Sequence, residues 1–243
     1  MHDPGRAATP TARLFAWIGA GLFVLSLGYF LYSYWMTFGR QTDGPPRPAV
    51  VVWNVVLFSV FALHHSVFAR DRVRRAVTQA WGRLERSFYV WLASLLFIAV
   101  CRLWLPLPGI VWDVNGVFVL VLLLLQLAGV ALSVYSAAAI DVWDLAGIRQ
   151  LDAQLPTPDS HTEFEFKTTG PYGLVRHPIY LGWFLIVFSV GTMTTTRFVF
   201  AVVSCAYILI AIPFEERSLR AMAGDAYDRY MQEVPRKLIP GLY

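Results

Sequence analysis

The sequence has little charge, only two cysteines and none of the short motifs that mark common soluble enzymes. Charged residues make up 15% of the 243 positions, whereas 57% are hydrophobic and the mean hydropathy is positive. Cys101 and Cys205 lie in apolar runs without Cys-x-x-Cys or Cys/His spacing, so we expect core packing and not a disulfide, metal site or nucleophile. No Gly-x-Gly-x-x-Gly run occurs, and no nucleic-acid-binding motif accompanies the net charge of +4. Such an apolar composition predicts a membrane protein.

Six apolar runs are candidates for crossing a bilayer, which takes about 20 helical residues. They comprise residues 12–36, 49–69, 87–105, 115–140, 178–192 and 198–214. The last two are the shortest, and we expect them to form a tight helical hairpin that turns at residues 192–197. No cleavage site follows the first run, so we treat it as a retained span. The sequence therefore predicts an all-α integral membrane protein with six spans, or five if the final pair does not fully cross.

Basic residues are distributed unequally between the segments that join these runs. Of the 20 lysines and arginines, all but Arg40, Arg47, Arg102 and Arg197 fall in segments that share one side of the membrane. The positive-inside rule then places both termini in the cytoplasm, together with a helical C-terminal tail. We expect a bacterial inner-membrane protein whose net charge reflects this topology and not a nucleic-acid partner.

Polar residues inside the predicted spans are costly, so each needs a partner or a role. Asn54 and Gln126 lie mid-span, and we expect them to hydrogen-bond between helices. His64 and His65 stand near the cytoplasmic end of the second run, where adjacent helical residues point in different directions, so at most one faces a given site. Each is either an interfacial histidine bonded to backbone or water, or a residue that contacts substrate.

Residues 141–169 form the one long polar insertion, with six acidic residues. We read them as a short amphipathic helix followed by a proline-containing loop. Asp141 and Asp144 are spaced as on a solvated helix face, so we expect no metal site there. The chain then divides into a four-helix membrane region over residues 1–140, this insertion, and a C-terminal region over residues 170–243.

The stretch "GPYGLVRHPIYLGW", residues 170–183, places basic groups at the start of an apolar helix. Pro178 suits the first helical position because it has no N–H to leave unsatisfied, so we expect the helix to begin at His177 and Pro178. A helix N-terminus flanked by Arg176 and His177 favours a carboxylate or phosphate ligand. Tyr180 shares their helix face, and Gly182 permits close approach of a ligand or another backbone.

The stretch "PFEERSLR" places Glu215 and Glu216 where the last apolar run leaves the membrane on the same side. Two interpretations of this acidic pair are open. The carboxylates either bind the cationic part of a ligand, or they form an interfacial salt-bridge set with Arg176.

Together, three blocks in the last third of the chain resemble the isoprenylcysteine carboxyl methyltransferase and phospholipid methyltransferase superfamily of membrane enzymes. They are "KTTGPYGLVRHPIYLG", "EERSL" and "GDAYDRYMQEVPRKLIP". The resemblance implies S-adenosylmethionine as methyl donor, held by the last two spans and by a tail that folds back as a lid through Tyr227, Tyr230 and Pro235. The cofactor-binding residues it implies are Tyr172, Arg176, His177, Pro178, Tyr180, Gly182, Glu215 and Glu216. No metal is implied.

The N-terminal half is similar to the bacterial methanethiol S-methyltransferase branch, through "LFALHHSVFAR", "ERSFYV", "VWDV" and "DLAGIRQ". This likeness implies S-methylation of a small thiol such as methanethiol, with His64, His65 and Arg176 as candidate catalytic residues. Transfer to a thiol mainly requires alignment of the reacting atoms, and a histidine is the candidate if a base is used. The alternatives are an isoprenylcysteine carboxyl or phospholipid N-methyltransferase acting on a lipidic acceptor, and a non-enzymatic membrane protein that retains the fold.

Overall fold

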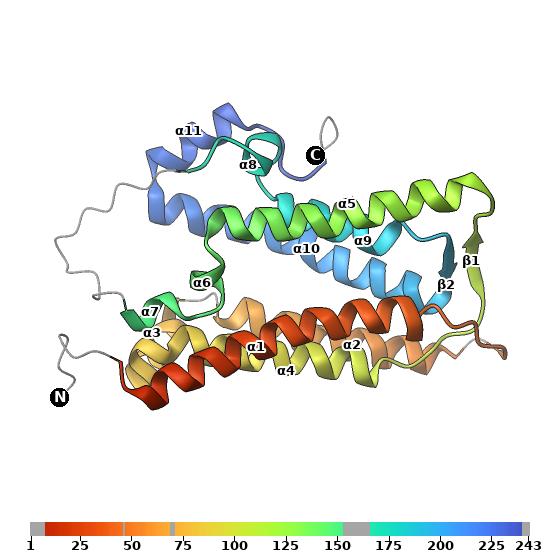
Figure 1. Ribbon diagram of the computed structural model, residues 1–243, viewed down its shortest axis with the longest axis horizontal. Coiled ribbons are helices and arrows are strands. Elements are labelled where there is room, and N and C mark those ends of the chain that lie inside the picture. The colour runs from red at the N-terminus through yellow and green to blue at the C-terminus, as the bar shows by residue number, and fades with distance from the viewer. Residues whose placement is uncertain (1–7, 46, 69–70, 153–165, 240–243) are drawn as a thin grey trace. The chain divides into compact units, whose positions relative to one another are not determined.

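The chain divides into two compact units, each built from two stretches of sequence. A computed structural model describes residues 8–45, 47–68, 71–152 and 166–239 (Figure 1). Unit 1 comprises Met1–Leu107 and Asp141–Ser160, and unit 2 comprises Pro108–Ile140 and His161–Tyr243. The chain thus leaves unit 1, builds one long helix of unit 2, returns for a short segment and ends in unit 2.

Unit 1 is a helical assembly in which α1 and α2 both pack against α4. Its elements are α1 (Pro10–Tyr32), the π turn η1 (Ser33–Thr37), α2 (Pro48–Phe68), α3 (Asp71–Trp81), the 3₁₀ turn η2 (Gly82–Leu84), α4 (Glu85–Leu103), α6 (Val142–Leu145) and α7 (Arg149–Asp152). Thr9 caps α1 by accepting a hydrogen bond from Ala12 N, and Pro10 occupies the first turn, where a missing N–H costs nothing.

Polar side chains tie these apolar helices together. Asn54 of α2 donates to the carbonyl oxygen of Leu105 and accepts from its N–H, each over 2.9 Å. The buried Ser87 hydroxyl of α4 donates to the Gly147 carbonyl, which fastens the segment carrying α6 and α7. The predicted interhelical role of Asn54 is therefore confirmed. Residues 153–165 of the predicted insertion lie outside the described residues.

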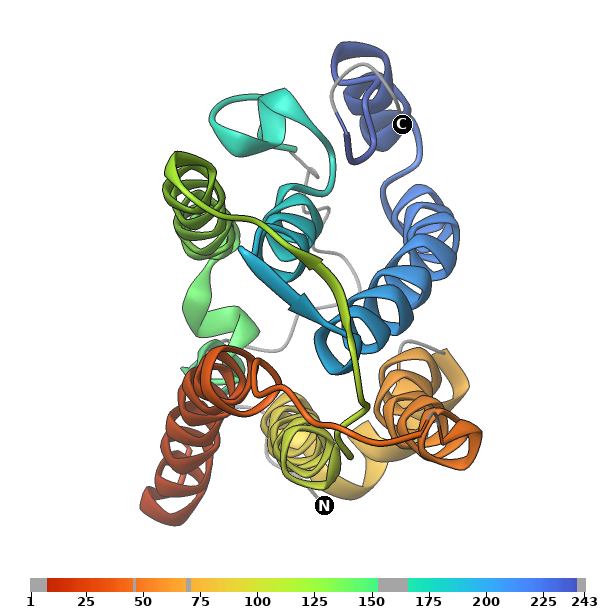
Figure 2. The same cartoon turned by 90° about the vertical axis from the view of Figure 1, so that its right-hand side faces the viewer.

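Unit 2 contains the rest of the helices and a two-stranded sheet. Its elements are β1 (Ile110–Asp113), α5 (Val117–Ile140), α8 (Pro171–Leu174), α9 (Pro178–Phe188), β2 (Thr192–Thr194), α10 (Thr195–Ala223) and α11 (Asp225–Glu233). Helices α5 and α9 lie side by side (Figure 2). Gln126 of α5 donates to the Ile186 carbonyl of α9 over 2.7 Å, so its predicted interhelical role is confirmed as well.

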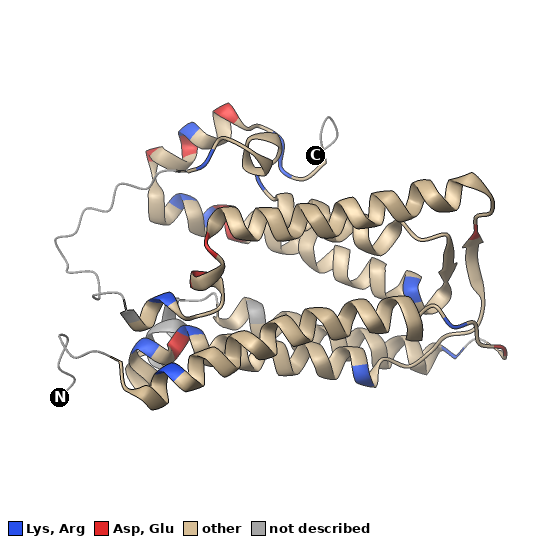
Figure 3. Cartoon of the chain, in the orientation of Figure 1, with Lys and Arg blue, Asp and Glu red and all other residues tan. Residues whose placement is uncertain are grey.

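Within the described residues, five helices are long and apolar enough to cross a membrane, the lower of the two predicted counts. They comprise Pro10–Thr37, Pro48–Phe68, Val77–Leu103, Val117–Ile140 and Thr195–Ala223. In Figure 3 these helices carry no charge over most of their length, and charged residues lie toward their ends. Helix α9 has 11 residues and rises about 16 Å, roughly half of the hydrocarbon thickness. The protein is an all-α integral membrane protein, and the expectation that residues 178–192 form a sixth span is wrong.

Residues 192–197 do not form the tight helical turn that we expected. Strand β2 pairs antiparallel with β1, and the main-chain groups just before β2 also bond to this partner strand. The Trp112 indole donates to the Val190 carbonyl, and Val114 N–H donates to the Gly191 carbonyl. Because the chain must be extended to make these bonds, α9 ends at Phe188. Thr194 then caps α10 by accepting from Arg197 N.

Candidate functional site

The C-terminal tail of unit 2 is hydrogen-bonded to the start of α9. Arg176 N–H donates to the Arg236 carbonyl and His177 N–H donates to the Lys237 carbonyl, each over 2.9 Å. His177 is the N-cap of α9 and Pro178 its first residue, as predicted. The two N–H groups that precede the helix are therefore occupied by the tail carbonyls.

Arg176 is buried, and most of its guanidinium is engaged within unit 2. Its Nε donates to Glu216 Oε1 over 2.8 Å, and Nη2 lies 2.7 Å from the same oxygen. Nη1 donates to the carbonyls of Val234 and Pro235, each over 2.8 Å. These contacts use four of the five donors of an arginine. Arg176 thus joins the start of α9, the C-terminal part of α10 and the tail.

Glu216 receives several cationic or proton-bearing groups on one carboxylate. Besides Arg176, His177 Nε2 lies 3.3 Å from Oε1 and Lys237 Nζ lies 3.9 Å from Oε2. The side chain of Glu216 is 13% exposed, so these partners compensate a largely desolvated charge. Of the two interpretations of the acidic pair, the salt bridge with Arg176 is present at Glu216.

Glu215, the neighbouring acid, has a different environment. Its side chain is 42% exposed, it accepts a 2.8 Å hydrogen bond from the Tyr180 hydroxyl, and His177 Nδ1 lies 3.9 Å away. The His177 and Tyr180 rings stack with centroids 5.4 Å apart and planes within 10°. One face of this cluster therefore combines an accessible carboxylate with a flat pair of rings.

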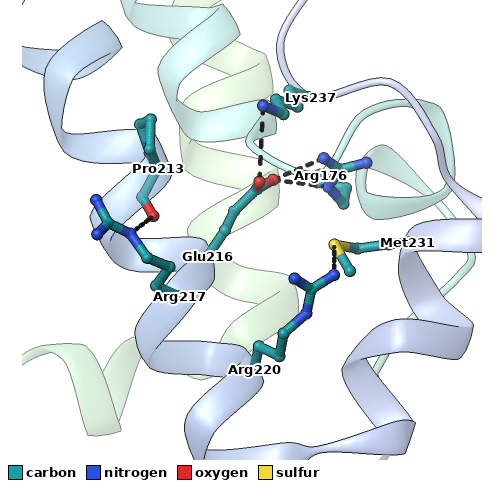
Figure 4. A pocket seen from close by; sticks show the side chains of 7 residues that line it. All are labelled: Arg176, Pro213, Glu216, Arg217, Arg220, Met231 and Lys237. Carbon is teal, nitrogen blue, oxygen red and sulfur yellow. Dashed lines mark hydrogen bonds and ion pairs between the residues drawn. The ribbon is translucent and has the colours of Figure 1, made fainter.

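A cavity of about 290 Å³ lies on the other side of Glu216, between α10 and the tail (Figure 4). Its lining residues are Arg176, Pro213, Glu216, Arg217, Arg220, Met231 and Lys237. In Figure 4 Glu216 stands in the middle, with Arg176 and Lys237 pointing at its carboxylate and the two α10 arginines on either side of it. Three arginines and one lysine face a single carboxylate in this lining, so the lining is positively charged.

Aromatic residues pack the tail onto the site. Tyr227 and Tyr230 of α11 are buried and contact Phe166, whose ring stacks on Tyr230. The Tyr230 hydroxyl donates to the Tyr172 carbonyl over 2.9 Å. Burial raises the pKa of Tyr230 to about 12, and burial also raises the pKa values of Tyr172 and Tyr227.

The Tyr227 hydroxyl has a particular place in this tail. It is buried and has no hydrogen-bond partner within the described part of the chain. It lies close enough to the ion pair for the charge of Glu216 to raise its pKa further and that of Arg176 to lower it. A buried hydroxyl of this kind has capacity for a ligand or a water molecule.

Gly182 lies in the helix contact and not among the residues that line the cavity. A Cβ at this position would come within 2.2 Å of Ser133 Oγ and 2.6 Å of the Gly129 carbonyl. Gly129 of α5 makes the reciprocal approach, with Gly182 O at 2.7 Å from a built Cβ. The pair of glycines lets α5 and α9 pack closely, which fixes the height of α9 and hence of His177.

The two candidate histidines belong to unit 1. His64 is buried in α2, with its ring stacked on Tyr89 at 5.2 Å and tilted against Phe68 at 4.6 Å. His65 follows in the same helix, but its side chain lies outside the described part of the chain. The structure thus brings Tyr172, Arg176, His177, Pro178, Tyr180, Glu215 and Glu216 together in unit 2, whereas His64 and His65 both belong to α2 of unit 1.

Sequence reasoning did not single out Lys237 and the two α10 arginines, Arg217 and Arg220, which line the cavity beside the cluster. The spacing of Glu216, Arg217 and Arg220 carries a usable signal, because residues three and four apart share a helix face. The hydrogen bonds from the N–H groups of residues 176 and 177 to the tail carbonyls leave no signal in the sequence, because every residue except proline has the same backbone groups.

The chain is similar to several curated proteins along most of its length. It is 37% identical to methanethiol S-methyltransferase 1 of Bradyrhizobium diazoefficiens over 84% of this chain and 71% of that protein. It is 32% identical to methanethiol S-methyltransferase 2 of the same organism over 95% of this chain and 90% of that protein. Nurim of Xenopus laevis is 28% identical over 64% of this chain and 57% of its own length. No protein-family model matches the chain, and no solved structure does.

The two methanethiol S-methyltransferases each match most of the chain at more than 30% identity, and the alignments take in both units. The five apolar helices agree with a membrane protein. The chain therefore belongs to the methanethiol S-methyltransferase family and is a membrane methyltransferase.

Proposed function

We propose that the protein transfers a methyl group from S-adenosylmethionine to the sulfur of a small thiol such as methanethiol. The names of the relatives support the thiol acceptor. The main structural support for a cofactor site is the hydrogen bond from Tyr180 to Glu215, since it joins two residues 35 positions apart in the sequence into one cluster. The same end of unit 2 also holds His177, Glu216 and the tail.

The residues present fit this cofactor. It carries a sulfonium and an ammonium, and the half-exposed Glu215 carboxylate with the stacked rings of His177 and Tyr180 suits a cation. The buried, unpartnered hydroxyl of Tyr227 suits a polar group of the same ligand. In this proposal Glu215, Tyr180 and His177 contact the cofactor. Glu216, Arg176 and Tyr172 hold the contact surface and the tail in place, and Gly182 and Pro178 fix α9.

When bound, S-adenosylmethionine supplies a methyl group attached to a cationic sulfur. A bond forms between the thiol sulfur and that methyl carbon, the carbon–sulfonium bond breaks, and the thiol proton leaves to water or a base. The protein's task is to align the two sulfur atoms and to exclude water. The packed tail serves the exclusion of water. His64 and His65 are the candidate bases, and their variants test whether a base is used.

We further propose that the site faces the cytoplasm of a bacterial inner membrane. The end of α10 that carries Glu215 and Glu216 also carries Arg217 and Arg220, and the tail that follows it carries Arg229, Arg236 and Lys237. Cytoplasmic segments of membrane proteins carry such an excess of arginine and lysine.

The first test is calorimetric binding of S-adenosylhomocysteine to the detergent-purified protein, with Glu215→Gln, His177→Ala and His64→Gln alongside. We expect saturable binding that weakens in the first two variants and persists in the third. The absence of binding to the intact, folded protein would overturn the cofactor assignment.

The acceptor is tested by headspace detection of dimethyl sulfide from methanethiol and S-adenosylmethionine. A prenylated cysteine and phosphatidylethanolamine serve as competing acceptors. Methylation of either competitor in preference to methanethiol would replace the thiol assignment while keeping the cofactor site. A pH profile of kcat/KM for His64→Gln that matches the wild type would remove His64 as a base.

A further inference from the structure

The cavity between α10 and the tail has more positive charge than its carboxylates neutralise. Four cations line it, Arg176, Arg217, Arg220 and Lys237. Glu216 is the carboxylate in the lining, and Asp228 pairs with Arg220 from outside over 2.7 Å. Two acids against four cations leave an excess of two positive charges around a space of about 290 Å³. Such a site favours an anion with two or more oxygens.

Three of these cations retain the capacity to bind a ligand. Arg217 donates from Nε to the Pro213 carbonyl, and its guanidinium lies over the Phe214 ring at 4.4 Å. Arg220 contacts Asp228 and the Met231 sulfur, and its five donors allow further bonds. Lys237 is 33% exposed and lies 3.9 Å from Glu216. Arg176 contributes mainly charge, because its donors are largely used.

The cavity lies at the level of the lipid head groups. Helix α10 begins at Thr195, and the uncharged stretch that follows Arg197 continues to Phe214, which is 60% exposed. Residues 195–214 rise about 30 Å, the thickness of the hydrocarbon layer. Arg217 then lies about 4.5 Å beyond the hydrocarbon edge and Arg220 about 9 Å. The head-group layer is roughly 5 to 8 Å thick on each side, so the backbone of Arg217 stands within it and that of Arg220 just beyond it.

We infer that this cavity is a second binding site, distinct from the cofactor contacts, that takes the phosphate of an acidic phospholipid head group. The volume supports a head group, since pockets for drug-sized ligands begin at about 300 Å³. The exposed Phe214 and the Arg217 guanidinium stacked on it would face the acyl chain and the phosphate of the same lipid. Because Glu216 and Lys237 lie in both this lining and the ion-pair cluster, lipid binding would stabilise the tail on the site.

The experiment titrates the purified full chain with short-chain phosphatidylglycerol and follows the midpoint of thermal unfolding. Short-chain phosphatidylcholine tests whether the acidic head group matters, and inorganic phosphate tests the free anion as the alternative source. We expect a saturable rise with phosphatidylglycerol, little rise with phosphatidylcholine and a smaller one with phosphate. Equal responses to the two lipids, or a full response to phosphate alone, would overturn the assignment.

Substitutions of the cavity arginines test whether phosphatidylglycerol binds in this cavity. Arg217→Gln should weaken the apparent affinity for phosphatidylglycerol about fivefold, and the double change with Arg220→Gln about thirtyfold. The matched control removes Arg102 and Arg229, two exposed arginines outside the cavity lining, and should leave the affinity unchanged. Arg217→Lys keeps the charge and should retain most of the response. An unchanged affinity in the double variant contradicts the proposal.

Binding of S-adenosylhomocysteine reports separately on folding and on the proposed function. The double variant should bind it like the wild type, which shows that any loss of lipid response is not unfolding. A wild-type protein that responds to phosphatidylglycerol but does not bind the cofactor analogue would overturn the methyltransferase site alone. The reverse result would overturn the lipid site alone.

Discussion

A buried arginine lies at each end of α10, and the partners of the two arginines differ. Arg197 belongs to the helix itself, whereas Arg176 precedes α9 and reaches α10 through Glu216. Arg197, at the start of the helix, donates to the Thr192 carbonyl over 2.6 Å beside the short sheet. Arg176 contacts the other end of α10 through the Glu216 carboxylate and also donates to two tail carbonyls. The first end is closed mainly by backbone bonds, whereas the second concentrates ionisable side chains. The second end is therefore the one at which we propose that the cofactor binds.

The largest effect should come from Arg176→Ala. This change leaves the largely buried Glu216 without its main partner and releases the Val234 and Pro235 carbonyls. Removing one member of a buried pair costs about 3 to 5 kcal/mol, so we expect a much lower free energy of unfolding and no binding of S-adenosylhomocysteine. Arg176→Lys should rescue neither fully, because an ammonium cannot reproduce the forked contacts. Wild-type binding by the alanine variant would show that the tail does not depend on this residue.

Substitution of Glu216 should mainly lower the free energy of unfolding, whereas substitution of Glu215 should mainly weaken binding of S-adenosylhomocysteine. Glu216→Gln leaves Arg176 facing a neutral amide and should cost about 1 to 3 kcal/mol of stability. Glu215→Gln removes a half-exposed charge and should change stability little while weakening S-adenosylhomocysteine binding. Chemical denaturation and calorimetry on both variants measure the two quantities. Equal losses of stability would contradict the different environments of the two carboxylates.

Alkaline pH should loosen the tail before the rest of unit 2. The folded pKa of Tyr230 is about 12, above the ordinary value of about 10, because burial favours the neutral phenol. The stability that this group contributes is complete below pH 10 and is lost as the pH rises through about 12. Tyr230→Phe removes this titration and, with it, the hydrogen bond to Tyr172, which is worth about 1 kcal/mol. Proteolysis of the tail across this pH range compares the two proteins, and an identical pH response would argue against burial of Tyr230.

The smallest effect belongs to the sheet end of unit 2. The Thr192 hydroxyl donates to an Asp113 carboxylate oxygen over 2.6 Å at an exposed position. Asp113→Asn keeps the shape and an acceptor, so we expect less than about 0.5 kcal/mol of destabilisation and unchanged cofactor binding. A clear loss of S-adenosylhomocysteine binding in this variant would mean that the two ends of α10 are coupled.

The sequence predicted the parts of the fold that depend on hydropathy and local helix chemistry. Five of the six apolar runs correspond to helices of spanning length, and His177 and Pro178 begin α9 as expected. Asn54 and Gln126 make the interhelical bonds that mid-span amides require. These features could be read from residues alone because the membrane forces each polar group to find a partner.

The remaining features depend on pairings between distant backbone segments. The bonds of β1 to residues 190–194 end α9 early, and no side-chain pattern distinguishes this from a tight helical turn. Gly182 was expected to admit either a ligand or another backbone, and the structure shows a backbone there. That this backbone is Gly129 could be seen only once α5 and α9 were placed together. The family resemblance implies that the tail folds over the site as a lid. The hydrogen bonds from the start of α9 to the carbonyls of residues 236 and 237 could be identified only from the structure.

The contacts of Arg176 also set an order of events during synthesis. Its carboxylate partner Glu216 follows 40 residues later, and the Val234 and Pro235 carbonyls follow 58 and 59 residues later. A ribosome adds about 5 to 20 residues per second, so the arginine waits some seconds for its last acceptors. The cluster around Arg176 can therefore be completed only after α10 and α11 have been made, and no cofactor contact that relies on the tail can form earlier.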